Sequence, residues 1–310
     1  MAHKLPLVSV IITTFKRPDL LRRSMLSVLE QDYDNIEFIV IDDNDPNSLY
    51  RRDTELIIRE FDKKIKYIKH NKNMGGWYAR NTGIQYSNGE YIAFLDDDDE
   101  YMSDYISLQI SKIENTQDKQ IGFVYCQMSV YENNKEKFRT KQFVAGNKEA
   151  LRIHLMGSIT GTSAMLFPKK VLQDVKGFKD LNCGQDFVLI LEILLKGYSI
   201  EYNKEPLVKY HIHTAQISYS YEKIIGEESL FKKRLQYSDI LSNKEKKQMT
   251  YSHLISQAFI SMKFSRIMSL KYFGKALILI PIKNQNILYF IKFCLPSKIF
   301  NILKYGSFFF

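Results

Sequence analysis

Four consecutive aspartates, Asp96–Asp99, followed by Glu100, are the densest group of reactive side chains in the sequence. They come directly after an apolar run of strand length, Tyr91–Leu95. Adjacent carboxylates repel one another and the interior of a sheet cannot solvate them, so we expect them where the strand emerges. A hard divalent cation with oxygen ligands would relieve the repulsion. A solvated acidic turn is the alternative interpretation, because charge runs are usually exposed.

Three further polar sites could act together with this acid run. Asp42 and Asp43 end a second apolar run, where a turn or cap before Pro46 is the alternative role. Arg80 follows two adjacent glycines that would let a ligand approach the backbone, although a lone Arg is more often a surface charge. Asp186 precedes an apolar helix, where simple capping is the alternative.

The elements that must position these groups alternate between strand and helix in the first hundred residues. The apolar patterns predict strands at Val8–Thr13, Ile36–Ile41, Ile65–Ile68 and Tyr91–Leu95, and helices from Pro18, at Leu49–Phe61 and at Trp77–Tyr86. This order predicts an α/β fold with a mostly parallel sheet and helices on both faces. Ligands bind outside the carboxyl ends of such strands, so this context favours a ligand site over a solvated turn.

The second half of the chain is less regular. Its patterns predict strands at Ile121–Tyr131, Phe138–Val144, Thr162–Phe167, Ser199–Tyr202 and Leu207–Ile212, and a helix at Phe187–Lys196. From Tyr221 to about Phe264 the chain is expected to be mainly helical, with a capping box at Ser242–Glu245.

Charge is unevenly distributed along the chain. Residues 1–245 hold 34 basic and 35 acidic side chains, whereas residues 246–310 hold ten basic side chains and no acid. This asymmetry predicts an anionic partner for the tail, and no nucleic-acid motif accompanies it. The apolar runs are shorter than the ~20 residues that span a bilayer. We therefore expect the tail to lie on an anionic membrane surface, with a helical cap packed on the catalytic domain as the alternative.

Cysteine usage and the N-terminus indicate the compartment. The cysteines at 126, 183 and 294 are scattered, odd in number and without a CxxC motif, which favours a reducing environment. The first strand pattern begins by Leu7, which leaves no room for a signal peptide. We expect a cytoplasmic protein that is peripheral on the inner face of the plasma membrane.

Five motifs occur in order between residues 7 and 215: VSVIITTF, IVIDDNDP, NMGGWYARNTGI, YIAFLDDDDEY and GQDF. Each alone is weak, but together they resemble glycosyltransferase family 2, nucleotide-sugar-dependent enzymes of GT-A fold. The resemblance implies a Rossmann-like, mostly parallel central sheet with flanking helices. It places a catalytic domain in residues 1–215, with a nucleotide-binding half (1–100) and an acceptor-binding half (101–215). Residues 216–310 would form a basic, helical, membrane-associating region.

The resemblance also implies roles for individual residues. Asp186 would be the general base that removes the proton of the acceptor hydroxyl. Asp98 would ligate Mn²⁺ or Mg²⁺, which stabilises the leaving diphosphate. The implied contacts to the nucleotide-sugar are Thr13, Asp43, Arg80, Asp96, Asp97 and His213. The assignment within Asp96–Asp99 stays open, because the run allows a slip of one residue. His211 and His213 would share one face of a strand, and packed or exposed histidines are the alternative.

Two departures from the family pattern affect the function. Gln185 replaces the usual Glu before Asp186, which leaves one carboxylate and puts acceptor recognition in doubt. No QxxRW motif follows Asp186, which argues for transfer of a single sugar and against a processive synthase.

The sequence thus predicts an inverting, metal-dependent glycosyltransferase. It would move one sugar from a UDP-sugar to a growing cell-surface glycan on a polyprenyl-diphosphate carrier. A nucleotidyltransferase is one alternative, but it would normally have a glycine-rich loop after the first strand, and TTFKRPD has no glycine. A catalytically inactive nucleotide-sugar-binding or membrane scaffold protein is the other, and the intact Asp98 and Asp186 argue against it.

Overall fold

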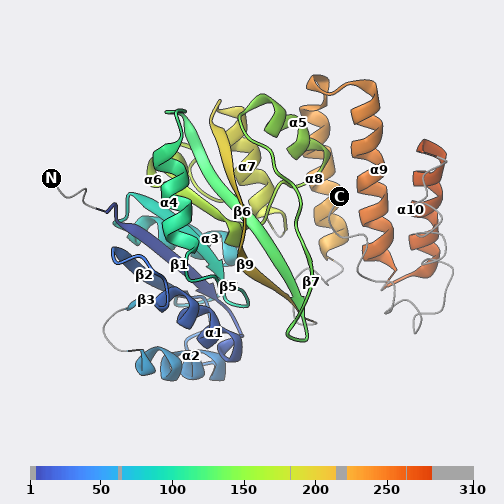
Figure 1. The fold of residues 1–310 in the computed structure, drawn as a ribbon. Coiled ribbons are helices and arrows are strands. Elements are labelled where there is room, and N and C mark those ends of the chain that lie inside the picture. Colours follow the sequence, from blue (N-terminus) through green and yellow to red (C-terminus); the bar gives the residue numbers. More distant parts are fainter. Residues whose placement is uncertain (1–4, 62–64, 182, 214–221, 263, 281–310) are drawn as a thin grey trace. The chain divides into compact units, whose positions relative to one another are not determined.

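The computed structural model describes residues 5–61, 65–181, 183–213, 222–262 and 264–280. The chain divides into two compact units (Figure 1). The first comprises Met1–Leu151, Ile159–Asp180 and Gln185–Ile212, and the second comprises Arg152–Ser158, Leu181–Gly184 and His213–Phe310.

The described residues of the first unit form a nine-stranded sheet flanked by helices. Its strands are β1 (Val8–Thr14), β2 (Ile36–Asp42), β3 (Ile65–Lys69), β4 (Tyr91–Asp96), β5 (Glu100–Tyr101), β6 (Ile121–Glu132), β7 (Lys135–Arg139), β8 (Met165–Pro168) and β9 (Ser199–Ile212). Its helices are α1 (Pro18–Leu29), α2 (Leu49–Glu60), α3 (Gly76–Tyr86), α4 (Tyr105–Asn115), α6 (Lys169–Asp174) and α7 (Gln185–Leu195), and α5 (Lys148–Met156) passes from this unit into the second.

The strand order explains why the polar strand ends meet. The sheet runs β3-β2-β1-β4-β8-β6-β9-β5, with β7 paired to β6. Strands β1 to β4 are all parallel to one another, as the alternating pattern predicts, and β6 is parallel to β9. The register pairs Thr13 with Asp96 and Thr14 with Asp42, so the carboxyl ends of β1, β2 and β4 lie at one edge.

Strand β1 is buried on both faces, and successive residues face opposite sides. Val10 and Ile12 belong to a core cluster that includes Leu21 of α1 and Ile110 of α4. Ile11 faces the other way, where Gly83 brings α3 against it. This close approach matters for the site, because α3 carries Arg80.

The structure corrects several predicted boundaries. Strand β7 ends at Arg139, and residues 140–144 do not continue it. The two short strands predicted at 199–202 and 207–212 are one strand, β9, whose register against β6 shifts between Cys126 and Gln127. The residues that interrupt the apolar pattern form an irregularity within the strand and do not end it. Helix α4 was not predicted, although its buried positions recur at helical spacing.

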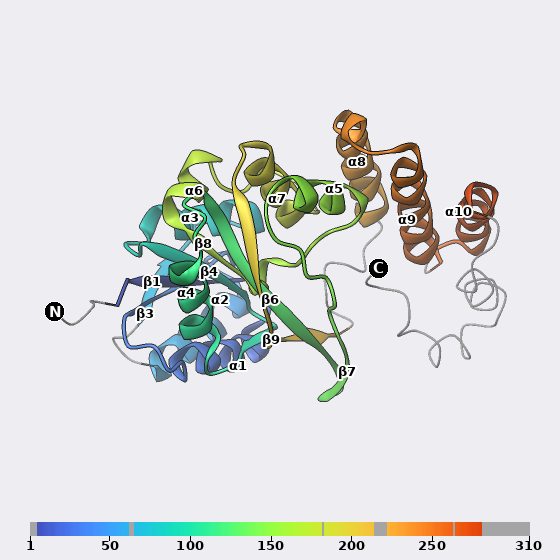
Figure 2. The same cartoon turned by 45° about the horizontal axis from the view of Figure 1, so that its top comes forward.

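The second unit contains three long helices among its described residues. They are α8 (Glu222–Gln236), α9 (Asn243–Ser261) and α10 (Arg266–Leu279), which lie side by side (Figures 1 and 2). The predicted capping box is confirmed, because Ser242 and Glu245 each accept a hydrogen bond from the other's backbone N–H. Tyr251, Ile255 and Phe259 of α9 form a small core with Phe273 and Ala276 of α10.

The apolar tail is described only as far as residue 280, so the predictions for residues 281–310 lie outside the described residues. Within the described ranges, no helix combines the length and the apolar character that crossing a bilayer requires.

Two helical glycines give a matched test of the packing of α3 on β1. A Cβ on Gly83 would lie 2.5 Å from Cγ2 of Ile11, whereas a Cβ on Gly274 of α10 would meet nothing within 4 Å. We expect Gly83→Ala to destabilise the protein by about 1–3 kcal/mol through overpacking. Gly274→Ala should stabilise it by up to about 1 kcal/mol, because Ala is the better helix former. Urea unfolding followed by circular dichroism checks both, and equal effects of the two changes would contradict this packing.

Candidate active site

The acid run forms a tight, buried turn at the end of β4. The N–H of Asp99 donates to the carbonyl of Asp96 at 3.1 Å. Asp97, Asp98 and Asp99 are only 4%, 5% and 1% exposed. The solvated acidic turn is therefore not what the structure shows. One carboxylate oxygen from each of Asp96, Asp98 and Asp99 lies within 4.8 Å of the others, an all-oxygen set that fits a hard divalent cation.

Arg17 neutralises part of this charge, and sequence reasoning missed it. Its Nη1 donates to Oδ1 of Asp97 at 3.0 Å and to Oδ2 of Asp98 at 2.7 Å. The hydroxyl of Thr14 donates to the other oxygen of Asp97 at 2.8 Å. No basic residue adjoins the acids in the sequence. The positive charge comes from Arg17, which lies in the loop from β1 to α1. Asp97 is thus held by this loop and is not one of the three clustered carboxylates.

The far end of the run is held by the second half of the sheet. Ser163 donates to Asp99 at 2.8 Å, and the backbone N–H of His211 donates to the same carboxylate at 3.2 Å. Burial, with the charges of Asp98 and Asp96, raises the pKa of Asp99 well above its usual range. Glu100 lies 2.6 Å from Nε2 of His211, so β9 contacts the run through His211.

Arg80 of α3 links the acid run to the start of α7. It donates to Oδ1 of Asp96 at 2.6 Å and to Oε1 of Gln185 at 2.9 Å. Its guanidinium carbon lies 5.4 Å from the ring centroid of Phe178. The amide of Asn81 exchanges two hydrogen bonds with the backbone of Phe178, so Asn81 holds Phe178 in place beside Arg80. This arrangement fixes the orientation of the guanidinium.

Asp186 lies in the first turn of α7 and is partly exposed. Its Oδ1 accepts a hydrogen bond from the N–H of Phe187 at 2.8 Å. Burial raises the pKa of its carboxyl group, Arg80 lowers it and Asp96 raises it. A carboxylate whose pKa is raised is a better proton acceptor, which suits a general base. Asp96 and Asp186 are far apart in the sequence, yet their carboxylates interact electrostatically at one edge of the sheet.

Asp43 shapes the glycine loop that precedes α3. It accepts hydrogen bonds from the N–H groups of Met74 and Gly75, each at 2.8 Å, and its Oδ1 lies 2.7 Å from Nδ1 of His70. Gly75 has φ +85°, a conformation that favours glycine. Asp42, at the end of β2, is also buried and forms an ion pair with Arg51 of α2. An Asx turn is present at this position, because Oδ1 of Asp42 accepts a hydrogen bond from the N–H of Asn44 at 2.9 Å. The neighbouring Asp43 organises the glycine loop.

The predicted site residues, apart from His213, lie in the first unit. Asp96, Asp98, Arg80 and Asp186 gather at one edge of the first unit, and Thr13 is paired with Asp96 across β1 and β4. His213 follows β9 directly and belongs to the second unit, so its predicted role stays a prediction. Sequence reasoning missed several residues around the acids, among them Arg17, Arg23, Ser24, Ser163 and Lys209.

The burial of Asp97 generates a pH dependence of stability. Burial raises its pKa to about 7, against about 3.9 in an unfolded chain. Between these values the folded state binds more protons than the unfolded state, so stability falls as pH rises through this window. We expect the metal-free protein to lose stability between about pH 4 and pH 7, and Asp97→Asn to flatten that slope.

Urea unfolding in EDTA at several pH values measures this slope. The exposed Asp34 supplies the control change, Asp34→Asn, which should leave the slope unaltered. A slope in Asp97→Asn as steep as in the unmodified protein would show that another group titrates.

Comparison with known proteins gives a consistent family. The sequence profile of glycosyl transferase family 2 matches residues 9–176. An uncharacterized glycosyltransferase of Methanocaldococcus jannaschii is 29% identical over 213 residues, which cover 67% of this chain and 71% of that protein. The Campylobacter jejuni GalNAc(5)-diNAcBac-PP-undecaprenol beta-1,3-glucosyltransferase is 29% identical over 189 residues, covering 60% of this chain and 59% of that protein.

The name of another relative includes its sugar donor. The Escherichia coli UDP-Glc:alpha-D-GlcNAc-diphosphoundecaprenol beta-1,3-glucosyltransferase WfgD is 33% identical over 145 residues, 46% of this chain and 54% of that protein. The chain thus spans between half and three fifths of the length of the two relatives whose substrates are named.

Solved structures share the fold. TarS 1-349 from S. aureus, in complex with UDP-GlcNAc, has a TM-score of 0.62 at 17% identity, over 96% of this chain and 86% of that one. The mannosyltransferase PcManGT from Pyrobaculum calidifontis, in complex with GDP-Man and Mn²⁺, has a TM-score of 0.60 at 15% identity, over 97% of this chain and 84% of that one. These likenesses confirm the predicted GT-A fold.

Proposed function

The chain belongs to glycosyl transferase family 2, and we propose that it transfers one sugar, with inversion, from a UDP-sugar to a hydroxyl group of a lipid-linked glycan. One observation carries the proposal: Arg80 bridges Asp96 of the acid cluster and Gln185, the neighbour of Asp186. A diphosphate at the acids would then lie close to the carboxylate that activates the acceptor. The family makes the chain a glycosyltransferase, which argues against a nucleotidyltransferase and an inactive scaffold.

The three clustered carboxylates fit Mn²⁺ or Mg²⁺, which prefer oxygen ligands. Asp98 would be the direct ligand, with Asp96 and Asp99 beside it. A bound divalent cation would stabilise the negative charge that develops on the leaving diphosphate. The PcManGT structure contains Mn²⁺, which supports this assignment by similarity of fold.

The donor would be held on both sides of the acid cluster. Asp43 accepts three contacts from the loop that precedes α3 and has about four lone-pair sites, so one remains for an N–H of a nucleobase. Thr13 would contact the same nucleoside, and Asp97 and His213 would complete the donor contacts. Arg80 uses two of its N–H groups on Asp96 and on the neutral amide of Gln185, and a guanidinium has five N–H donors, so others could donate to the diphosphate. The UDP-Glc in the name of WfgD and the UDP-GlcNAc bound to TarS support a uridine donor.

Asp186 would be the general base. It would take the proton of the acceptor hydroxyl while that oxygen bonds to the anomeric carbon from the face opposite the diphosphate. The bond between the anomeric carbon and the diphosphate oxygen would break, which inverts the configuration. The raised pKa of Asp186 suits this role, because general bases work best when their pKa approaches the working pH.

The names of the relatives support the proposed acceptor. The excess of basic residues near the C-terminus supports the proposed location. Both substrate-named relatives act on undecaprenol-diphosphate-linked glycans. The ten basic residues without an acid after Glu245 would attract an anionic membrane surface at roughly 1 kcal/mol each. We place the catalytic domain in residues 1–215 and the membrane-associating region in 216–310, on the inner face of the plasma membrane. The known nucleic-acid motifs are missing from the sequence, so we propose no nucleic-acid partner.

Asp98→Asn tests the metal site. The variant should lose turnover and the Mn²⁺-dependent part of its affinity for UDP, because it removes one charge from the cation site. Titration calorimetry of UDP with Mn²⁺ and with EDTA measures the difference, and Asp34→Asn is the matched control. Equal UDP affinity with and without Mn²⁺, unchanged in the variant, would contradict the assignment.

Asp186→Asn tests the base. It should bind UDP-sugar and fold normally, yet turn over at least about a hundredfold more slowly. The exposed Asp180 provides the control Asp180→Asn, six residues earlier, which should keep full activity. Wild-type activity in Asp186→Asn would place the base elsewhere, and loss of folding would show that the carboxylate only caps α7.

A further inference from the structure

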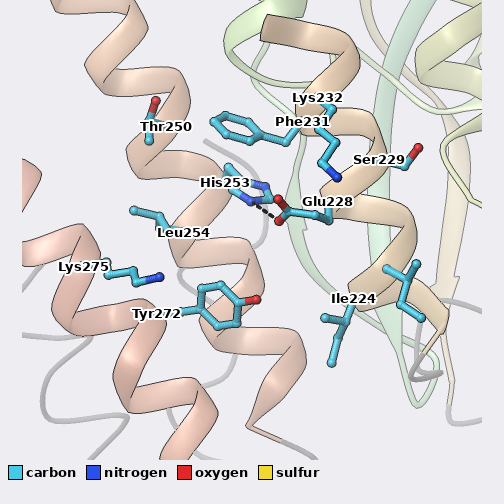
Figure 3. A pocket seen from close by; sticks show the side chains of 11 residues that line it. Ile224, Glu228, Ser229, Phe231, Lys232, Thr250, His253, Leu254, Tyr272 and Lys275 are labelled. Atoms are coloured by element: carbon cyan, nitrogen blue, oxygen red, sulfur yellow. Dashed lines mark hydrogen bonds and ion pairs between the residues drawn. The ribbon is translucent and has the colours of Figure 1, made fainter.

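The second unit contains a pocket of about 540 Å³ between α8, α9 and α10 (Figure 3). This volume lies within the range of small-ligand sites, roughly 300–1,000 Å³. All of the residues that line it belong to the second unit, and none of them is a residue of the acid cluster. No role in the proposed chemistry requires it.

One part of the pocket wall is apolar. Ile224 and Phe231 come from α8, Leu254 from α9 and Tyr272 from α10. The ring of Phe231 stacks on His253, with centroids 4.0 Å apart and planes inclined by 6°. Aliphatic and aromatic side chains on three helices form a surface suited to a hydrocarbon chain.

The other part of the wall is cationic. Lys232 of α8 and Lys275 of α10 reach toward the pocket from opposite sides (Figure 3). Within the described ranges, no carboxylate lies within 4.0 Å of either ammonium group. Glu228, the carboxylate of the pocket, lies 3.1 Å from Nε2 of His253. Two ammonium groups therefore face the pocket without a paired acid.

A buried polar atom on the wall also lacks a partner. His253 is 4% exposed, and its Nδ1 has no hydrogen-bond partner in the part of the chain that is described. Buried polar atoms are usually paired, and an unpaired one calls for an explanation such as a missing ligand or water.

We propose that this pocket binds a lipid diphosphate. The phosphate oxygens would contact Lys232 and Lys275, and the first carbons of the lipid would lie along Phe231, Leu254 and Tyr272. Two lysines on opposite sides of the pocket could each contact one of two linked phosphate groups, which a single phosphodiester does not offer. This inference rests on the proposed function, whose acceptor carries such a diphosphate, and it assigns the helices of the second unit to holding that carrier.

The test uses the full chain and geranyl diphosphate, a short and soluble isoprenoid diphosphate. Titration calorimetry in EDTA limits metal-dependent binding of diphosphate at the acid cluster. Geranyl diphosphate should bind more tightly than inorganic diphosphate, geraniol or a short-chain phosphatidylglycerol. The double change Lys232→Glu and Lys275→Glu should weaken it at least about tenfold, because charge-assisted contacts to phosphate are strong.

The control double change is Lys244→Glu and Lys247→Glu on α9. Both residues are exposed and neither lines the pocket, so the same change in net charge should leave the affinity unaltered. Lys232 and Lys275 are also exposed, so folding should survive their replacement. Unchanged affinity in the pocket variant, or equal affinity for phosphatidylglycerol, would overturn the proposal.

Hydrolysis of UDP-sugar with Mn²⁺ tests the proposed donor chemistry separately from the proposed lipid-diphosphate pocket. The pocket variant should hydrolyse the donor at the rate of the unmodified protein, because its lysines are outside the donor site. An unmodified protein that binds geranyl diphosphate but acts on no UDP-sugar would refute the proposed donor and leave the pocket standing. Donor hydrolysis without any binding of geranyl diphosphate would refute the pocket and leave the donor standing.

Discussion

The burial of adjacent carboxylates at the end of β4 is the constraint on which the rest of the site depends. Asp97, Asp98 and Asp99 are almost fully buried, and uncompensated charges there would be costly. The fold supplies the compensation from distant segments: Arg17 pairs with two of the acids, Arg80 pairs with Asp96, and hydroxyl groups satisfy other oxygens. The strand order that brings these segments together also creates the candidate site.

The same compensation connects the two halves of the first unit. Arg80 contacts both the acid run and Gln185, which stands before Asp186 at the start of α7. Gln185 is neutral, so it accepts a hydrogen bond from Arg80 without adding a second negative charge beside the guanidinium. The N–H groups of Arg80 that these two contacts leave free could then donate to a donor diphosphate. The Gln that departs from the family pattern thus keeps Arg80 in place, at the expense of a second carboxylate for the acceptor.

The sequence predicted the parts of the fold that depend on local pattern. Buried strands in the first hundred residues are continuous apolar runs, and the acids follow the last of them, so both the parallel sheet and its polar edge were foreseeable. Contacts between residues far apart in the sequence could not be foreseen. Nothing near Arg17 in the sequence marks it as the partner of Asp97 and Asp98. The continuity of β9 was also missed, because its middle residues break the apolar pattern while the strand still pairs with β6.

The central claim is that the clustered acids hold a divalent cation and, through it, the donor diphosphate next to Asp186. Anomalous diffraction at the manganese edge, from crystals grown with Mn²⁺ and UDP, tests it most directly. We expect one strong peak in ligand contact with Asp98 and with the UDP diphosphate, with Arg80 beside the phosphates. UDP bound without a manganese peak at the acids, or a peak at another group of carboxylates, would contradict it.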